Sequence, residues 1–243
     1  MTDDSIKLAR SYVENSKMPV ILTGAGISAE SDIPTFRGAG GYWRNKGFEE
    51  LACSRAFCEN PREQWDWYLE RRRTCWLAEP NPGHFAITNF LKNRSSAVLV
   101  TQNVDGLHER AGSDAVRIHG SIWENKCSRC LEVTKINPPD HLTYDNLPVC
   151  VKCEGPERVG VVWFGESIPT DAFVAAEKAI EDCDLLIVVG TSGTVYPAAA
   201  WIGRASNKSA PVIEINPTPA FGHYASVLLR GANGEFLPKI FVS

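Results

Sequence analysis

The sequence has no long apolar run and no excess of basic residues. Its apolar runs are short, as in LLIVV at 185–189, whereas a helix that crosses a membrane needs about 20 apolar residues. The first residues, MTDDSIKLAR, carry acids before bases and lack the apolar segment of a signal peptide, so we expect a cytoplasmic protein with no membrane partner. At a net charge of -4, the broad basic surface that binds nucleic acid is not expected either.

Cysteine is present, but not in the setting that favours disulfides. Eight cysteines in 243 residues could pair, yet disulfide frameworks belong mainly to short secreted chains, so we expect reduced thiols. Four of them lie among apolar neighbours and are expected to be small core residues: Cys53, Cys58, Cys75 and Cys183. With 44% apolar and 22% charged residues the composition is ordinary, and we expect one globular unit and a monomer.

Short β-branched segments alternate with amphipathic segments along the chain. Buried parallel strands are expected in MPVILTG (18–24), SAVLVTQNV (96–104), DLLIVVG (184–190) and APVIEIN (210–216). Crossover helices are expected in SIKLARSYVEN (5–15), GHFAITNFLKN (83–93) and TDAFVAAEKAIED (170–182), where apolar residues recur every three or four positions. This alternation predicts an α/β fold with a doubly wound parallel sheet, whose ligands bind beyond the carboxyl ends of the strands.

Two segments break the alternation, and we interpret them as insertions that form a smaller lobe. Residues 44–80 have a helical pattern and are rich in Trp and Arg, whereas residues 124–158 hold four cysteines and several prolines. The segments 1–43, 81–123 and 159–243 are assigned to the sheet. All of them are expected to belong to a single catalytic domain, 1–243.

The four cysteines of the second insertion have the spacing of a zinc ribbon. Two C-x-x-C pairs, separated by nineteen residues, are formed by Cys127, Cys130, Cys150 and Cys153. Two such pairs supply four thiolates, which close a tetrahedral site and leave no open position for a substrate. We therefore predict one structural zinc ion rather than a catalytic one.

Glycine and polar residues follow three of the predicted strands. Gly24-Ala25-Gly26-Ile27-Ser28 could let backbone N–H groups approach a pyrophosphate at the start of a helix, but it lacks the third glycine of GxGxxG and could also be a tight turn. Gly190-Thr191-Ser192 and Asn216 end two other strands. Because these strand ends meet at one edge of a parallel sheet, together they favour a dinucleotide site.

A histidine lies close to a polar strand end. TQNVDGLH (101–108) contains Gln102, Asn103 and Asp105, and His119 follows in RIHG. A histidine in such polar company can act as a general base near neutral pH. The other histidines, His84, His108, His141 and His223, lie in predicted helix starts or loops and are expected to be exposed or to cap a helix.

Together these motifs resemble the sirtuins. The resemblance is carried by GAGISAESDIPTFRG (24–38), TQNVDGLH, RIHG, the two C-x-x-C pairs, VVWFGE (161–166), GTSGTVYPAA (190–199) and GANGEFLP (231–238), in the family's order and over nearly the whole chain. It implies NAD-dependent removal of acyl groups from lysine side chains. It also implies a Rossmann-like lobe with a zinc-ribbon lobe beside it.

The resemblance assigns roles to individual residues. Catalytic roles fall on His119, as the base for the NAD ribose, and on Asn103 and Asp105. NAD contacts are implied for Gly24, Ala25, Gly26, Ser28, Ile33, Phe36, Arg37, Trp43, Gln102, Asn103, Val104, Asp105, Gly190, Thr191, Ser192, Asn216 and Asn233. Acylated-lysine proteins or peptides are expected to bind as an added strand between VVWFGE and TVYPAA, against Val162, Phe164, Val195 and Tyr196.

The segment WDWYLERRR (65–73) resembles one branch of the family, class III, in which a Tyr-x-x-Arg pair binds acyl chains that end in a carboxylate. Tyr68 and Arg71 match this pair, and their spacing puts both on one helix face. Ala39 is small where deacetylases often carry a bulky residue, which would leave room for a longer chain. Glu70, Arg72 and Arg73 are expected on a solvated face, and Trp65 and Trp67 are expected to pack.

The sequence therefore predicts a deacylase that removes succinyl and malonyl groups in preference to, or alongside, acetyl, with release of nicotinamide and O-acyl-ADP-ribose. The alternatives are an enzyme that is mainly a deacetylase, an ADP-ribosyltransferase, or a non-catalytic NAD-sensing or zinc-ribbon adaptor that binds acylated partners. Two departures from the family pattern are visible: Val159-Gly160 replaces a proline-containing junction after Arg158, which would loosen a hinge, and Asp32 replaces a glycine.

Overall fold

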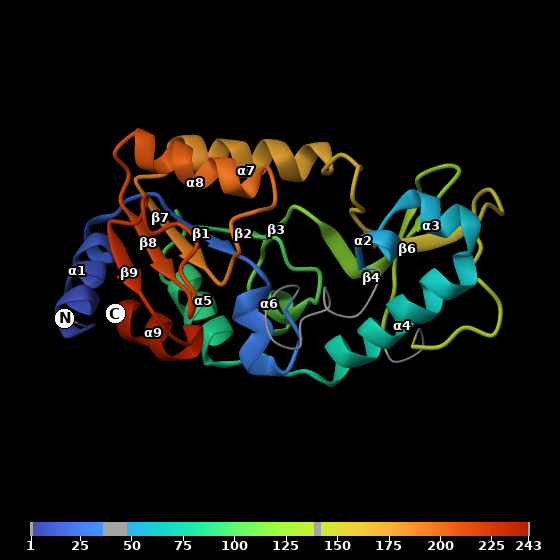
Figure 1. Cartoon of the computed structure of the whole chain (residues 1–243), viewed down its shortest axis with the longest axis horizontal. Helices are drawn as coiled ribbons and strands as arrows, with labels where there is room; N and C mark the ends of the chain where they lie inside the picture. Colours follow the sequence, from blue (N-terminus) through green and yellow to red (C-terminus); the bar gives the residue numbers. More distant parts are fainter. Residues whose placement is uncertain (1, 36–47, 139–141, 243) are drawn as a thin grey trace.

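The computed structural model describes residues 2–35, 48–138 and 142–242, and these residues contain a six-stranded parallel sheet (Figure 1). The strands lie in the order β3-β2-β1-β7-β8-β9. Their bounds are Pro19–Thr23 (β1), Val98–Thr101 (β2), Val116–Arg117 (β3), Leu185–Val189 (β7), Val212–Ile215 (β8) and Val227–Leu229 (β9). The four strands expected from the sequence are confirmed, and short β3 and β9 add the two edges.

Helices cover both faces of this sheet. One face carries α1 (Thr2–Asn15), α5 (Pro82–Lys92) and α9 (Asn233–Ile240), and the other carries α7 (Thr170–Asp182) and α8 (Ala198–Asn207) (Figure 1). Most positions of the central strands are apolar because both faces of the sheet are buried, with Ile21 and Ile187 in one core and Leu22 and Val188 in the other. The predicted doubly wound α/β fold is confirmed.

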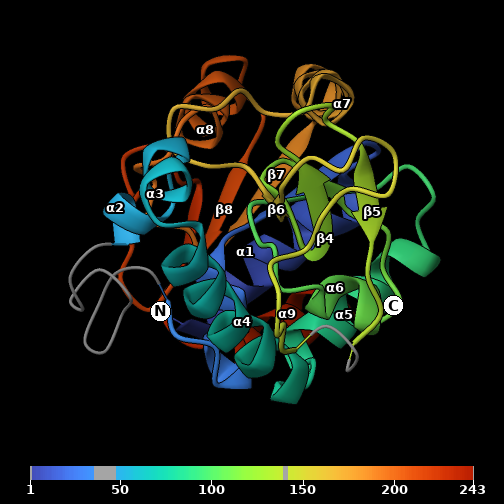
Figure 2. The same ribbon diagram turned by 90° about the vertical axis from the view of Figure 1, so that its right-hand side faces the viewer.

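A smaller lobe lies beside the carboxyl ends of the strands (Figures 1 and 2). It contains α2 (Phe48–Leu51), α3 (Ser54–Glu59), α4 (Pro61–Leu77) and an antiparallel sheet of β4 (Gly120–Cys127), β5 (Val133–Lys135) and β6 (Glu157–Val161) in the order β5-β4-β6. Helix α4 begins where the Asn60 side chain accepts a hydrogen bond from the Glu63 backbone N–H. A third apolar core, with Trp65, Ile122 and Val159 among its members, joins α4 to β4 and β6.

Helix α4 is packed on more sides than its charged sequence indicates. Arg73 and Glu70 are exposed as expected, but the expectation for Arg72 is wrong, because its side chain is 0% exposed. Its guanidinium donates to the Ile122 carbonyl oxygen at 2.8 Å and to Asn125 Oδ1 at 2.8 Å, both on β4. Trp65 is buried as expected. The arginine thus ties the helix to the antiparallel sheet.

The cysteines outside the C-x-x-C pairs do not share one environment. Cys75 and Cys183 are buried as expected, whereas Cys53 is half-buried and Cys58 is exposed on the short helix α3, so the core expectation is wrong for Cys58.

The junction expected to be loose lies in a paired strand: Val159 lies within β6 and pairs with Asn125 of β4. Within the described ranges, no helix has the length and the apolar character needed to cross a membrane.

Candidate active site

The order in which successive strands are added to the large sheet changes side at β1. From β1 the chain builds β2 and β3 on one side, and β7, β8 and β9 on the other, so the β1 and β7 carboxyl ends flank the topological switch point. The loops that follow these strands touch: the Gly24 N–H donates to the Val189 carbonyl oxygen at 2.9 Å, and the Gly26 N–H donates to the Gly190 carbonyl oxygen at 2.7 Å. A crevice of this kind is where such sheets bind ligands.

Glycine is required here by the contact between the two loops. A Cβ atom at position 26 would lie 2.6 Å from the Gly190 Cα, and Gly190 itself has φ of +59°, a left-handed conformation that favours glycine. The segment after the turn is a 3-10 helix, η1 (Ala25–Ser31), and not the regular helix start expected from the sequence. The glycines therefore bring two strand ends together at the floor of the crevice.

A cavity of about 830 Å³ opens at this switch point, within the range of roughly 300–1,000 Å³ that small-molecule and cofactor sites occupy. Both loops and both lobes contribute to its walls. Seventeen of the residues predicted from the sequence line it, namely Gly24, Ala25, Gly26, Tyr68, Arg71, Gln102, Asn103, Val104, His119, Val162, Phe164, Gly190, Thr191, Ser192, Val195, Tyr196 and Asn216.

The other predicted site residues lie elsewhere. Ser28, Ile33, Asp105 and Asn233 are buried and do not line the cavity, although three of them hydrogen-bond to residues around it or to each other. Asn233, for example, donates from Nδ2 to the Gly26 carbonyl oxygen at 2.9 Å, which supports the glycine loop from behind. Four predicted residues lie outside the described residues: Phe36, Arg37, Ala39 and Trp43.

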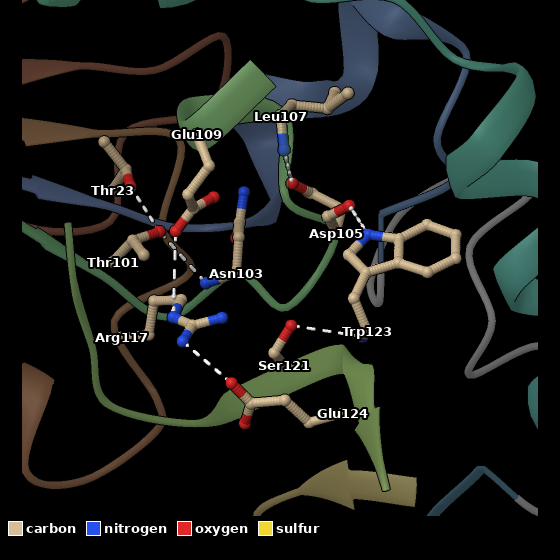
Figure 3. Close-up of polar contacts among 10 residues, drawn as sticks. All are labelled: Thr23, Thr101, Asn103, Asp105, Leu107, Glu109, Arg117, Ser121, Trp123 and Glu124. Carbon is tan, nitrogen blue, oxygen red and sulfur yellow. Dashed lines mark hydrogen bonds and ion pairs between the residues drawn. The ribbon is translucent and has the colours of Figure 1, made fainter. Parts of the chain in front are cut away.

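Ser28 connects the two polar side chains that follow β2. Its hydroxyl accepts a hydrogen bond from Asn103 Nδ2 at 3.1 Å and donates to Asp105 Oδ2 at 2.8 Å. The Leu107 N–H donates to the other oxygen of Asp105 at 2.9 Å (Figure 3). Burial raises the pKa of the Asp105 carboxyl, and the hydrogen bonds from Leu107 and Ser28 oppose that rise. The network fixes the orientation of the Asn103 amide at the cavity wall.

A second set of hydrogen bonds holds the backbone of the loop that follows β2. The Thr101 hydroxyl accepts a hydrogen bond from the Asn103 N–H at 3.1 Å and another from the Thr23 hydroxyl at 2.7 Å, and the Trp123 indole N–H donates to the Asp105 carbonyl oxygen at 2.7 Å (Figure 3). Strands β1, β2 and β4 therefore all contact the loop. Such support is what a loop needs to present side chains in a fixed geometry.

His119 has the tautomer that a general base requires. Its Nδ1 lies 3.0 Å from the Gln102 carbonyl oxygen, which can only accept, so the imidazole hydrogen is on Nδ1 and the lone pair is on Nε2. The side chain lines the cavity. Burial lowers the pKa of His119 from 6.5, while the hydrogen bond to Gln102 opposes this, so the imidazole is neutral at pH 7.

Tyr68 and Arg71 line the same cavity from α4. They are 1% and 7% exposed, and the Arg71 Cζ lies 5.5 Å from the centre of the Tyr68 ring and 4.8 Å from that of Trp67. Burial raises the pKa of Tyr68 to about 12, which keeps its hydroxyl protonated at neutral pH. The pair thus offers a buried cation and a neutral hydroxyl to whatever occupies this part of the cavity.

Two chain segments line the mouth of the cavity. One continues from β6, where the Val162 N–H donates to the His119 carbonyl oxygen at 2.9 Å, and the other follows β7. Phe164 and Tyr196, one from each segment, are 45% and 76% exposed. Trp163, next to Phe164 in the chain, is buried.

The four ribbon cysteines form a cluster that fits a zinc ion. Their Sγ atoms all lie within 4.8 Å of one another, with 3.5 Å between Cys127 and Cys153 and 3.6 Å between Cys130 and Cys150. A tetrahedron with Zn–S bonds of about 2.3 Å places its sulfurs about 3.8 Å apart, close to these distances. Backbone N–H groups point at Cys127 Sγ and Cys150 Sγ, which favours thiolates.

Some residues at the site have no signal in the local sequence. The segment after Asn216, residues 217–220, lines the cavity, and only the rule that ligands bind beyond strand ends could have pointed to it. His84 caps α5, as expected for a histidine at a helix start. His108 is buried, with its ring centre 4.9 Å from that of His84, so the expectation is wrong for His108. His108 lies at the carboxyl end of β1, where its Nε2 lies 3.0 Å from the Thr23 hydroxyl.

Comparisons with known proteins agree with this geometry. Residues 24–197 match the sequence model of the Sir2 family. The chain is 45% identical over 228 residues to NAD-dependent protein deacylase 2 of Pyrobaculum aerophilum, covering 93% of this chain and 90% of that protein. It is 44% identical over 239 residues to the NAD-dependent protein deacylase of Ralstonia nicotianae, covering 96% and 94%.

Solved structures are similar over nearly the whole chain. The fold matches a Sir2 homolog–NAD complex with a TM-score of 0.88 and 40% identity, covering 97% of this chain and 91% of that one. It also matches a Sir2–p53 peptide–NAD+ structure with a TM-score of 0.85 and 29% identity, covering 97% and 96%.

Proposed function

The chain belongs to the Sir2 family, and from this membership we propose that it is an NAD-dependent protein-lysine deacylase that removes succinyl and malonyl groups in preference to, or alongside, acetyl. The cavity at the switch point is the site of both NAD and the acyl chain. The cysteine cluster holds a structural zinc ion that stabilises the smaller lobe.

The side chains around the cavity have different roles in the proposed reaction. Bound NAD supplies an electrophilic ribose carbon when its nicotinamide leaves. The Asn103 amide, oriented by Ser28, would contact the nicotinamide end, and the Ser192 and Asn216 side chains lie after strand ends, where they would hold ribose and phosphate groups. His119 would take a proton at Nε2 from a ribose hydroxyl, because its Nδ1 is committed to the Gln102 carbonyl oxygen.

The preference for acidic acyl groups is carried by one observation: buried Tyr68 and Arg71 line the cavity that His119 also lines. A guanidinium offers a planar fork that matches a carboxylate, and a hydrogen bond to a charged group contributes about 1.5–3 kcal/mol. An acetyl group has no carboxylate to accept these bonds. A succinyl chain extends further into the cavity and ends in one.

The partner is an acylated protein or peptide. Its backbone would lie as an added strand between the segment of Val162 and Phe164 and the segment of Val195 and Tyr196, which line the mouth of the cavity. Recognition through the backbone reads the modified lysine more than the flanking sequence. A broad range of acylated substrates fits this mode.

The test compares initial rates on one peptide that carries acetyl, malonyl, succinyl or glutaryl lysine, for the unmodified enzyme and for Arg71→Met. Loss of a charged hydrogen bond should lower kcat/KM for desuccinylation about 10- to 100-fold. Deacetylation should change less than threefold, because the acetyl group does not reach the guanidinium.

Arg73→Met is the matched control, because Arg73 lies on the same helix and is exposed. It should leave both rates unchanged. If Arg71→Met lowers deacetylation as much as desuccinylation, the preference for acidic acyl groups is wrong. An unmodified enzyme with no activity on any of the four peptides would overturn the deacylase proposal itself.

A further inference from the structure

Trp163 forms a hydrogen bond with Tyr68, the tyrosine that we propose contacts the acyl chain. Its indole Nε1 lies 3.0 Å from the Tyr68 hydroxyl oxygen, and an indole nitrogen can only donate. Tyr68 is therefore the acceptor in this hydrogen bond. Both side chains are buried and both line the cavity, so the Tyr68 hydroxyl hydrogen must point away from Trp163.

The indole ring packs against two side chains. The Arg158 guanidinium lies over its face, 4.0 Å from the ring centre, and the Phe57 ring packs 5.7 Å away. Arg158 in turn donates to both oxygens of Glu166, at 2.7 and 2.8 Å. Glu166 also accepts a hydrogen bond from the Trp163 backbone N–H at 3.0 Å. The direction of the indole N–H is thus fixed before any substrate binds.

We propose that Trp163 is a positioning residue for acyl selection: its N–H occupies the Tyr68 oxygen and leaves the Tyr68 hydroxyl hydrogen to donate to the terminal carboxylate of the acyl chain. This inference rests on the proposed function. A donor on the Tyr68 oxygen also polarises the O–H bond, which makes the hydroxyl a better donor to an anion. The arrangement favours a carboxylate over a neutral acyl end.

A purely packing role for Trp163 makes a different prediction. Packing depends on ring volume, so its loss would disturb the cavity for every acyl group. The hydrogen-bond role depends on the N–H, so its loss affects only those substrates whose carboxylate reaches Tyr68. Phenylalanine keeps an aromatic ring at this position and removes the N–H, and therefore separates the two roles.

The experiment is a double-mutant cycle with Trp163→Phe and Tyr68→Phe, measured on succinyl and acetyl peptides. Trp163→Phe should lower kcat/KM for desuccinylation about three- to tenfold, mainly through KM, because one neutral hydrogen bond is lost. Deacetylation should stay within twofold. In the Tyr68→Phe background, Trp163→Phe should have no further effect on either substrate. Equal losses on both substrates, or an undiminished effect in the Tyr68→Phe background, would overturn the proposal.

A spectroscopic readout does not depend on turnover. In enzyme labelled with nitrogen-15, the indole signal missing from Trp163→Phe belongs to Trp163. Succinyl-lysine peptide should move this proton signal downfield, because donation from the hydroxyl to the carboxylate makes the Tyr68 oxygen a stronger acceptor. Acetyl-lysine peptide should not. An unchanged signal with the succinyl peptide contradicts the role of Trp163.

Arg71→Met distinguishes this failure from failure of the proposed function. If Arg71→Met loses desuccinylation and Trp163→Phe does not, only the inference about Trp163 is wrong. If Arg71→Met also retains desuccinylation, the acidic acyl group does not bind at Tyr68 and Arg71. The proposed preference for acidic acyl groups and the proposed role of Trp163 are then both wrong.

Discussion

The imidazole Nδ1 of His119 lies 3.0 Å from the Gln102 carbonyl oxygen, so the backbone that follows β2 determines which ring nitrogen of His119 can accept a proton. Burial lowers the pKa of this histidine from 6.5. The base is active only when neutral. Activity should therefore be complete above the lowered pKa and be lost as the pH falls through it.

We expect the acid limb of kcat/KM on an acetyl-lysine peptide to have its midpoint below pH 6.5. The acetyl peptide is chosen because a succinyl carboxylate would titrate itself. His119→Asn should lower the rate about 100- to 10,000-fold. His223→Asn, which changes an exposed histidine, should leave the profile unaltered. A limb centred at or above pH 6.5 contradicts this role for His119.

Removal of zinc should unfold the smaller lobe. The cysteine cluster ties the end of β4 to the segment before β6, and the chain continues from β6 into the Val161 and Val162 wall of the cavity. Cys150→Ala should therefore lower Tm, reduce the zinc content below one ion per chain, and abolish deacylation.

Cys58→Ala is the control for the zinc prediction, because Cys58 is exposed and lies outside the cluster. It should bind one zinc ion per chain and keep its activity. Full zinc content in Cys150→Ala, measured by metal analysis, would contradict a four-cysteine site.

Glu214 should control NAD affinity without touching NAD. Its buried carboxylate, on β8, accepts hydrogen bonds from the Ala220 N–H at 2.6 Å and the Phe221 N–H at 3.0 Å, and so holds the 217–220 segment against the cavity. Glu214→Gln places an amide N–H against a backbone donor. We expect Kd for NAD to rise about tenfold, as for loss of one charged hydrogen bond, with little change in kcat.

Titration calorimetry with NAD checks this prediction. Glu235→Gln, which changes an exposed carboxylate on α9, should leave Kd unchanged. If Glu214→Gln binds NAD as tightly as the unmodified enzyme, the carboxylate does not hold the segment in its binding conformation.

The sequence predicts the large sheet and much of the cavity lining for a physical reason. Strands buried on both faces are continuous apolar runs, and in a parallel sheet their carboxyl ends meet, so the residues after Thr23, Thr101 and Val189 come together whatever the loops between them do. Polar residues at those positions are readable from local sequence. The ribbon cysteines are readable from their spacing alone.

Contacts between the lobes are not readable in this way. Trp163 meets Tyr68 across 95 positions of sequence, and the hydrogen bonds of Arg72 to β4 span about 50. A charged residue on a helix is usually solvated, and only the packing of α4 against β4 reverses that preference for Arg72. The burial of His108 is not readable from the sequence for the same reason, because a helix as short as α6 has no local signal of burial.

Arg72 therefore gives the clearest contrast between a local pattern and its tertiary context. Its guanidinium donates to the Ile122 carbonyl oxygen and to Asn125, and it lies 5.1 Å from the centre of the Trp65 ring. Arg72→Met removes these donors and leaves buried acceptors without partners, so we expect a loss of about 2–5 kcal/mol in the free energy of unfolding. Arg73→Met, on the exposed side of the same helix, should cost less than about 0.5 kcal/mol. Urea unfolding of the two variants separates them, and equal midpoints would show that the buried guanidinium contributes no more to stability than a solvated one.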